Sequence, residues 1–329
     1  MDAPAFDFPT SVTRSTDLSA STADTRTGHH VFAPVTPDEV ERGRSTFAAE
    51  WDTAVRSVPS SDDGGASTFE AMDLLRRPVA RATCAAVLVD LDPDTRDRVA
   101  DEVLAWIDAL APVIASPRAP RRWSRTRRRE HRARVALEQS LADVLPGCGI
   151  TDTPSVVATM LAAGIQVPIA AGAWLLVHLA DRTDEDFDAD HAVWESLRLT
   201  PPTWVTARIT TGPVEVGGIA LPAAAVVLVS PLLLGRQREL APDGPEDLMR
   251  FCPKRWDRGD MRPGAWLPFG AGAHACPGRT LGLALLRDLA VWARPHRMTL
   301  ASSVTIDQSR GILPKPASLA VELWEGSDS

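Results

Sequence analysis

The chain has 329 residues, of which 44% are hydrophobic, and its 35 basic and 43 acidic residues give a formal net charge of −8. This length and apolar content predict a folded core and exclude a disordered chain. The acidic balance argues against nucleic acid and membrane as partners. The four cysteines form no CxxC pair, and no leader-like segment opens the sequence. We therefore expect a reducing, cytoplasmic setting.

The first segment, Met1–Gly28, is rich in Ser, Thr, Asp and Ala and has little periodic apolar content. We expect it to be mobile or loosely packed, and residues 29–329 to form a single domain. Apolar residues then recur every three or four positions, which predicts a series of amphipathic helices. The four predicted helices are Thr36–Val55, Thr68–Val89, Asp94–Ile114 and Arg125–Val144.

Nine arginines gather in the fourth of these helices and in the turn before it. They are Arg118, Arg121, Arg122, Arg125, Arg127, Arg128, Arg129, Arg132 and Arg134. One interpretation is a docking site for an acidic carrier protein or an anionic substrate. The other is a solvated helix whose arginines pair with neighbouring carboxylates. Nucleic acid fits poorly, because Trp123 is the one aromatic residue within the stretch.

A long apolar helix is predicted next, from about Val156 to Ala180, with Thr153 or Ser155 as its cap. Polar residues and a proline interrupt its apolar run, so a buried core helix is favoured over a bilayer span. Pro168 has no N–H to donate, which frees the carbonyl of Gly164 and predicts a kink. Either that carbonyl holds a water or a substrate donor, or the kink serves packing alone.

A short helix is predicted at Asp190–Leu199, in which Glu195 and Arg198 stand three residues apart. Residues at this spacing share a helical face, where a carboxylate and a guanidinium can form a bidentate pair. The spacing of apolar residues then changes from a helical pattern. β-Branched residues and glycine turns across Val214–Val229 predict short antiparallel strands. Near the C-terminus, Val304–Leu323 is predicted to be a loop with a closing strand pair.

The most informative stretch runs from Phe269 to Gly278 and reads F-G-A-G-A-H-A-C-P-G, just before a predicted helix at Arg279–Trp292. It places Cys276 where backbone N–H groups and a helix N-terminus can stabilise a thiolate, as a thiolate ligand of iron requires. The glycines allow the main chain to approach the sulfur and a flat macrocycle. The alternative is a structural cysteine in a strand-to-helix turn.

This stretch resembles the cysteine-ligand loop of the cytochromes P450, F-G-x-G-x-H-x-C-x-G, at every fixed position. The E-x-x-R pair, and Arg255 within Phe251–Trp256, precede the loop in the same order as in that family. The resemblance covers roughly Gly28 to the C-terminus and implies a mainly α fold with small β-sheets. The family's N-terminal strands and its region between helices B and C are missing or compressed here. We therefore expect an N-terminally truncated P450-like fold with a reduced first sheet and an open distal face.

The same resemblance implies haem b, iron protoporphyrin IX, with the thiolate of Cys276 as the axial ligand of the metal. It also implies that Glu195, Arg198 and Arg255 form a structural triad that holds the cysteine loop. The further residues that it assigns to the haem are Phe269, Gly270, Gly272, His274, Gly278 and Arg208. His30 stands roughly at the position of another propionate ligand, and the alternative for it is a solvated histidine.

The central helix departs from the family at the residues that deliver protons. Where P450s have A-G-x-[DE]-T-[TS], residues 163–168 of this chain read A-G-I-Q-V-P. Gln166 can form hydrogen bonds but cannot shuttle a proton near neutral pH, and Val167 has no donor at all. Gly164, Gln166 and Val167 are therefore the candidate catalytic positions, with a proton delivery unlike that of the family.

Three functions remain open. The resemblance implies a haem-thiolate oxidoreductase, either a monooxygenase or a peroxide-dependent enzyme, that oxidises a small or carrier-protein-tethered metabolite. A ferredoxin-type redox partner would then dock near Cys276, where Arg279 and Arg287 offer positive charge. The missing acid and alcohol favour a second function, in which the haem catalyses a rearrangement, dehydration, cyclisation or coupling without oxygenation. The third is a non-catalytic partner protein, against which the retained cysteine loop argues.

Overall fold

The computed structural model describes residues 6–7, 33–59, 67–180, 187–238, 247–257, 266–271, 275–307, 313–314 and 317–323. Three predicted site residues lie outside these ranges, namely His30, Gly272 and His274, as does Met1–Gly28 apart from Phe6 and Asp7. The described chain is mainly helical with small antiparallel sheets, which confirms the fold class predicted from the sequence.

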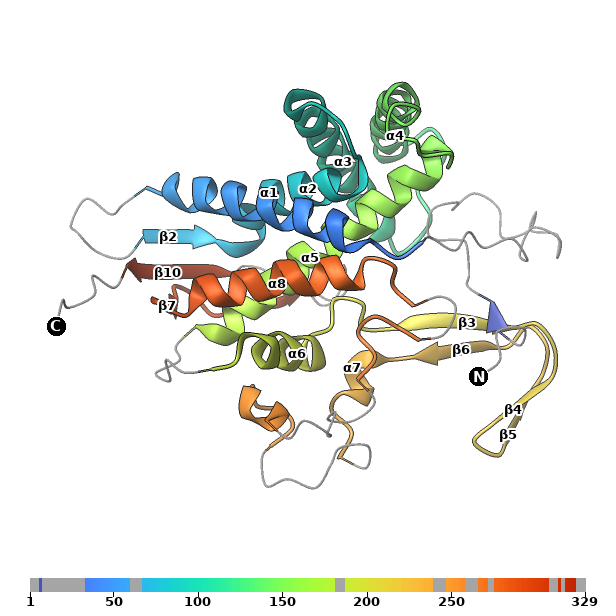
Figure 1. Ribbon diagram of the computed structural model, residues 1–329. Coiled ribbons are helices and arrows are strands. Elements are labelled where there is room, and N and C mark those ends of the chain that lie inside the picture. The colour runs from blue at the N-terminus through green and yellow to red at the C-terminus, as the bar shows by residue number, and fades with distance from the viewer. Residues whose placement is uncertain are drawn as a thin grey trace.

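The helices form the larger part of the molecule and lie mostly on one side of it (Figure 1). They are α1 (Pro37–Arg56), α2 (Ala71–Val87), α3 (Pro93–Ile114), α4 (Arg125–Val144), α5 (Pro154–Leu179), α6 (Ala189–Leu199), α7 (Pro231–Leu234) and α8 (Arg279–Ala293). A short 3₁₀ helix at Pro253–Trp256 follows α7. Most bounds agree with the sequence-based expectation within two residues, because caps such as the Thr36–Glu39 capping box mark them locally.

Within the described residues the strands form four small antiparallel sheets, ordered β1-β3-β6, β2-β10-β7, β4-β5 and β8-β9. The strands are β1 (Phe6–Asp7), β2 (Ser67–Glu70), β3 (Thr206–Thr210), β4 (Val214–Val216), β5 (Ile219–Leu221), β6 (Val226–Val229), β7 (His296–Leu300), β8 (Ile306–Asp307), β9 (Leu313–Pro314) and β10 (Ser318–Leu323). In Figure 1 the two three-stranded sheets lie on opposite sides of α8.

The expected helix at Thr68–Val89 is wrong at its start, because its first residues belong to strand β2. This strand pairs with β10, so that Phe69 lies opposite Leu319 and is buried. The helix begins only after Glu70, whose carboxylate accepts hydrogen bonds from the N–H groups of Asp73 at 2.8 Å and Ala317 at 2.9 Å. The pairing joins residues about 250 positions apart, which the local pattern does not reveal.

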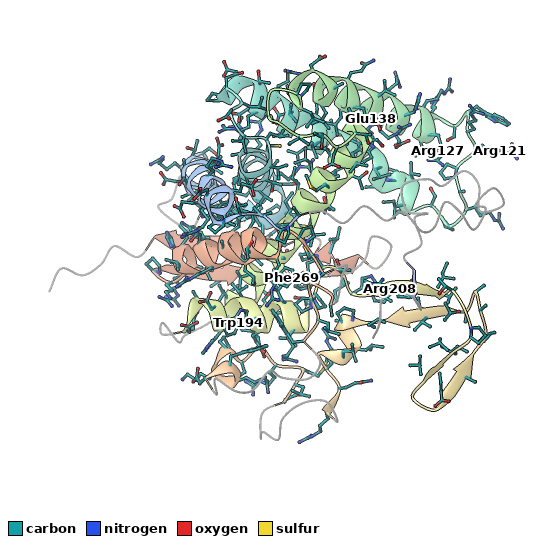
Figure 2. All side chains as sticks on the ribbon, turned by 45° about the vertical axis from the view of Figure 1, so that its right-hand side comes forward. Arg121, Arg127, Glu138, Trp194, Arg208 and Phe269 are labelled. Atoms are coloured by element: carbon teal, nitrogen blue, oxygen red, sulfur yellow. The ribbon has the colours of Figure 1, made fainter. Side chains whose placement is uncertain are left out.

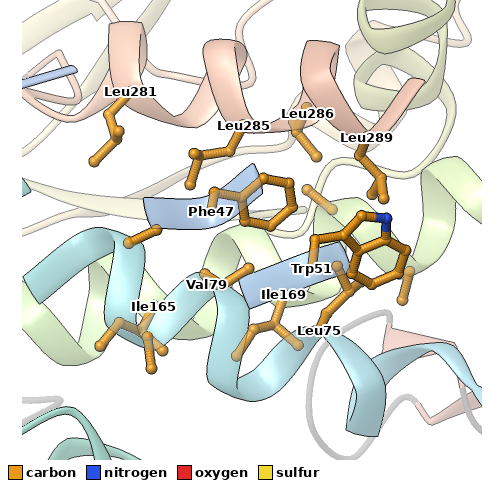
Figure 3. Close-up of a cluster of buried hydrophobic side chains, with 14 of the residues drawn as sticks. Phe47, Trp51, Leu75, Val79, Ile165, Ile169, Leu281, Leu285, Leu286 and Leu289 are labelled. Atoms are coloured by element: carbon orange, nitrogen blue, oxygen red, sulfur yellow. The ribbon is translucent and has the colours of Figure 1, made fainter. Parts of the chain in front are cut away.

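The core lies where helices α1, α2, α5 and α8 meet (Figure 3). Its central side chains, drawn there, are Phe47, Trp51, Leu75, Val79, Ile165, Ile169, Leu281, Leu285, Leu286 and Leu289. Arg44 of α1 adds a bidentate bond to Asp288 of α8, at 2.7 and 2.9 Å. This packing fixes α8, and with it the end of the cysteine loop that precedes the helix, against the helical layer.

Helix α5 is the one helix in the described ranges that is long and apolar enough to cross a membrane. Its most apolar window is 56% buried inside the protein, so packing in the core accounts for its composition. The helix starts after Thr153, whose side chain makes no capping hydrogen bond, and it continues through Pro168. Gly172 brings it close to its neighbours, since an added Cβ there would stand 3.0 Å from Leu75 and 3.2 Å from Leu289.

Candidate functional site

A buried ion-pair cluster lies at the start of the site, on helix α6. Arg198 donates both Nε and Nη2 to the carboxylate of Glu195 at 2.8 Å, and neither side chain is exposed. Arg255, from the 3₁₀ helix, donates its Nε to the same carboxylate at 3.3 Å. The structure thus brings the three residues of the predicted triad together, two of them from one helix and the third from a segment 60 residues further on.

The remaining donors around this cluster anchor the backbone that leads to the cysteine loop. The Nη1 of Arg198 donates to the carbonyls of Gly235 at 2.7 Å and Leu248 at 2.8 Å. The N–H of Cys252 donates to Glu195 at 3.1 Å, and the indole N–H of Trp256 does so at 2.9 Å. A buried carboxylate needs donors of this kind, because an unpaired buried charge is strongly unfavourable.

The charge state of Glu195 follows from these contacts. Burial by itself raises the pKa of the Glu195 carboxyl, but the hydrogen bonds and the charges of Arg198, with help from Trp256 and Arg255, outweigh it. The net effect holds the pKa of Glu195 below its ordinary value. The carboxylate is therefore ionised near neutral pH, where it can bind both guanidiniums.

A ladder of aromatic rings runs from helix α6 to the cysteine loop, between Trp194 and Phe269, both labelled in Figure 2. Trp194 meets Trp256 with ring centroids 5.5 Å apart, Trp256 meets Trp266 at 5.8 Å, and Trp266 meets Phe269 at 6.1 Å. The indole N–H of Trp266 also donates to the carbonyl of Trp194 at 3.1 Å. The buried cluster and the loop are therefore in continuous contact.

The cysteine loop itself closes through backbone hydrogen bonds. The N–H of Cys276 donates to the carbonyl of Phe269 at 2.9 Å, and Gly270 between them has φ +66°, which a residue with a Cβ rarely adopts. Outside the loop, the N–H of Val35 donates to the carbonyl of Pro277 at 3.2 Å. Gly278 is the N-cap of α8, so Cys276 stands two residues ahead of the helix N-terminus.

Cys276 is the one exposed cysteine among the four, all of which the structure describes. Cys84 is fully buried, and burial raises the pKa of its thiol to about 12, so it remains a neutral core residue. For Cys276, desolvation of the sulfur raises the pKa, whereas a hydrogen bond from the N–H of Gly278 lowers it. The loop alone thus favours a neutral thiol, and a thiolate here requires a cation at the sulfur, as a metal would provide.

Helix α5 presents a small exposed apolar surface among buried and half-buried positions. Beyond its first turn, the exposed positions of this fully described helix are Ala163 and Val167, the latter 39% exposed. They stand four residues apart and share one face. An exposed thiol on one element and an exposed apolar helix face on another are the surfaces that a flat apolar macrocycle with a thiolate ligand would cover, so these residues fit a haem.

The carbonyl freed by Pro168 has a partner in the structure. The hydroxyl of Thr83, on helix α2, donates to the carbonyl of Gly164 at 3.3 Å. Thr83 is buried, and no sequence pattern pointed to it. This bond favours the packing interpretation of the proline over a carbonyl reserved for a water or a substrate. Gln166, two residues after Gly164, is half-buried.

The other predicted haem contacts are partly described. Arg208, labelled in Figure 2, lies on β3, is half-buried and donates its Nη1 to the carbonyl of Ala207 at 2.9 Å. Burial lowers the pKa of Arg208 below its ordinary value, although an arginine stays charged. Trp256 and Trp266 were not predicted from the sequence as site residues. Two tryptophans close together, just before the cysteine loop, were the signal that could have found them.

The arginine stretch divides into two groups. Arg134 pairs with Glu130 and Glu138, and Arg127 approaches Glu130, a carboxylate that also accepts from Trp106. Seven other arginines of the stretch are exposed, and so is Trp123, which is 71% exposed. Figure 2 shows Arg121 at the outer end and Arg127 and Glu138 along α4. Carboxylate pairing therefore accounts for two of the nine arginines.

Known proteins share the part of the chain that holds this site. The family model described as cytochrome P450 matches residues 189–291, which span α6 to α8 and so the buried cluster and the cysteine loop. Cyclooctat-9-en-7-ol 5-monooxygenase of Streptomyces melanosporofaciens is 47% identical over 94 residues, or 28% of this chain and 20% of that protein. Pentalenene oxygenase of Streptomyces avermitilis is 33% identical over 111 residues, or 31% and 24%. The matches thus span about a fifth to a quarter of these relatives, from 20% to 24%.

Solved structures resemble the chain over a larger share. A six-coordinated cytochrome P450 from Thermus thermophilus has a TM-score of 0.68 at 19% identity, covering 97% of this chain and 88% of that one. Cytochrome P450SP alpha, in complex with (R)-ibuprophen, has a TM-score of 0.67 at 21% identity, covering 88% and 76%. At these identities the likeness establishes the fold.

Proposed function

We propose that the chain is a member of the cytochrome P450 family and a haem-thiolate oxidoreductase acting on a small apolar metabolite. The observation that carries the proposal is Cys276, an exposed thiol at the N-terminus of α8. Its loop is joined through Trp266 and Trp256 to the Glu195 cluster. When bound, the haem supplies the one-electron and oxygen chemistry. The chain supplies the sulfur ligand, its positioning and the apolar face of α5.

The substrate class is proposed from the relatives and from the site. The names of the two relatives above point to a hydrocarbon, pentalenene, and an alcohol, cyclooctat-9-en-7-ol. The exposed positions of α5, Ala163 and Val167, would offer such a molecule an apolar surface with no hydrogen-bonding group. A carrier-protein-tethered substrate remains the variant of this proposal in which the exposed arginines of Arg118–Arg134 receive the acidic carrier.

Proton delivery is the step at which this chain has to differ from its family. Gln166 and Val167 hold no titratable group, and the carbonyl of Gly164 accepts from Thr83. Protons would then come from solvent, from a substrate hydroxyl, or with a peroxide that already carries them. A ferredoxin-type partner would meet Arg279 and Arg287, of which Arg287 lies 3.6 Å from Asp190. Peroxide would remove the need for that partner.

A second candidate keeps the haem and omits oxygenation, and Gln166 and Val167 are the observation that favours it. In this case the iron catalyses a rearrangement, dehydration, cyclisation or coupling of the same class of substrate. A non-catalytic role is disfavoured, because a scaffold does not require an exposed thiol at the N-terminus of α8.

The test is spectroscopic. Purified protein, reduced and exposed to carbon monoxide, should give the red-shifted Soret band of thiolate ligation, and Cys276→Ser should abolish it. Cys148→Ser, which changes a half-buried cysteine remote in sequence, is the matched control and should keep it. Protein that binds no haem would refute the proposal. Turnover with dioxygen and a reductase, with peroxide, and without either oxidant then separates oxygenation from the second candidate.

A further inference from the structure

We propose that Trp266, Trp256 and Trp194 form a path for electrons between the cysteine site and the protein surface. This path would return electrons to the haem iron after the iron has been oxidised in the absence of a substrate. The inference rests on the proposed function, since it needs an oxidant at Cys276. It assigns to the three tryptophans a protective role that is separate from substrate oxidation.

The spacing of the rings suits such a path. Neighbouring centroids lie 5.5 to 5.8 Å apart from Trp194 to Trp266, with edge-on angles of 61° and 73°. At these separations the rings are in van der Waals contact, so an electron crosses only short gaps from ring to ring. At the inner end Trp266 contacts Phe269, whose carbonyl accepts the N–H of Cys276. Because Phe269 belongs to the cysteine loop, the path begins in direct contact with that loop.

Hydrogen bonds hold two of the rings in place. The indole N–H of Trp256 donates to Glu195, and that of Trp266 donates to the carbonyl of Trp194. Trp256 is 4% exposed, so the middle of the path is shielded from water. At the outer end Trp194 is half-buried and lies 5.4 Å, centroid to centroid, from His191, which bonds to the exposed Asp257. The path thus runs from the loop through the interior to the surface.

Composition restricts which residues can carry the charge. The chain has ten tryptophans and no tyrosine, so indole is the one readily oxidised aromatic group available. Phe269 is much harder to oxidise and serves as a contact only. A second aromatic group, Trp51 with Trp292 and His296, lies between α1 and α8 and meets no ring of the ladder among the described contacts. It offers a matched control.

The electron count is as follows. A peroxide oxidises the haem iron by two electrons, and each passage along the path returns one of them. Trp266 would donate an electron to a haem bound at Cys276, Trp256 would then reduce Trp266, and Trp194 would reduce Trp256. The oxidised indole of Trp194 loses its N–H proton to water. A thiol in solution then returns a hydrogen atom to that nitrogen, and two thiyl radicals combine to a disulfide.

The experiment exposes the haem-loaded protein to peroxide without substrate or thiol and maps oxidised tryptophan by peptide mass spectrometry, with freeze-quench electron paramagnetic resonance for the radical. We expect oxidation concentrated at Trp194. Trp194→Phe keeps the backbone carbonyl that Trp266 uses and removes the outer station. In this variant the oxidised residues should be Trp256 and Trp266, and the haem should bleach faster than in the unchanged protein. Trp292→Phe should behave like the unchanged protein.

Two controls make the outcomes decisive. Trp123, which is 71% exposed, reports oxidation by peroxide in solution, so labelling of Trp123 equal to that of Trp194 would overturn the path. The path would also be overturned if Trp194→Phe showed the same oxidation of Trp256 and Trp266, and the same rate of haem bleaching, as the unchanged protein. The carbon monoxide band is recorded for each variant. Loss of that band from the unchanged protein refutes the proposed function and the path together, whereas an intact band with either negative result refutes the path alone.

Discussion

The buried ion pair of α6 is surrounded by hydrogen-bond partners. Glu195 accepts hydrogen bonds from Arg198, Arg255, Trp256 and the backbone of Cys252. The Nη1 of Arg198 donates to two backbone carbonyls. The sequence predicted the ionic part of this arrangement, because a motif carried it. It did not predict the indole donor or the bond of Thr83, since neither follows from spacing along one helix.

His178 gives a pH prediction at this scale. It is stacked between Trp174 and Phe251, its Nε2 lies 3.0 Å from the hydroxyl of Thr200, and burial lowers its pKa from 6.5 to about 4. Nearby Glu195 raises this pKa, while Arg198 and Arg236 lower it further. The unfolded chain therefore binds the proton first. Stability from this group is complete above pH 6.5 and is lost as the pH falls towards 4, by on the order of 3 kcal/mol.

The measurement is urea unfolding between about pH 7.5 and pH 4. His178→Gln should flatten the fall in unfolding free energy between pH 6.5 and about pH 4, because its side chain does not titrate. His131→Gln, at an exposed histidine of α4, should leave the fall unchanged. An equally steep fall in His178→Gln would show that other groups cause it.

Among the elements, helices were predicted well and strands less well. Helices α3, α4 and α5 begin and end near the expected residues because caps and apolar spacing are local signals. Strand β3 was not predicted, and β6 pairs with it and not with the β4–β5 hairpin. In each case contacts between distant segments decide which strands pair, and the alternation of apolar and polar residues along one segment does not reveal those contacts.

Close approach between elements gives a second prediction, at Gly235 after α7. A Cβ there would stand 2.6 Å from the carbonyl oxygen of Arg198 and 3.1 Å from its Cγ. A backbone carbonyl cannot move aside as the end of a flexible side chain can, so the added methyl group would be strained. Gly235→Ala should therefore lower the unfolding free energy by about 1–3 kcal/mol. Denaturant unfolding measures this. Gly212→Ala, where nothing lies within 4 Å, should change it little, and equal effects would contradict the argument.

At the scale of the whole molecule, distant parts of the chain are joined by a few contacts. The β2-β10-β7 sheet ties residues 67–70 to residues 318–323, and the Arg44–Asp288 pair ties α1 to α8. Recognition of the cysteine loop predicted the fold class, and apolar periodicity predicted most of the helices. The expected shortening of the first sheet and the role of Met1–Gly28 stay predictions, because most of that segment lies outside the described residues.

A truncation tests how far this sheet supports the molecule. Removal of residues 318–329 deletes β10, exposes Phe69 and Met298, and should lower the thermal midpoint or abolish soluble expression. Removal of residues 324–329 leaves every strand pair in place and serves as the control. Equal thermal midpoints for the two truncations would show that β2 and β7 hold without their central strand.

The hydrogen bond between Thr83 and Gly164 couples a residue choice on helix α2 to one on helix α5. Because Pro168 has no N–H to donate to the carbonyl of Gly164, the hydroxyl of Thr83 on α2 serves as a donor to it. Restoring an ordinary residue at 168 would return that carbonyl to its helix and leave the hydroxyl competing for it. The two positions are therefore coupled: loss of the Thr83 hydroxyl leaves the Gly164 carbonyl without this donor only while Pro168 is present.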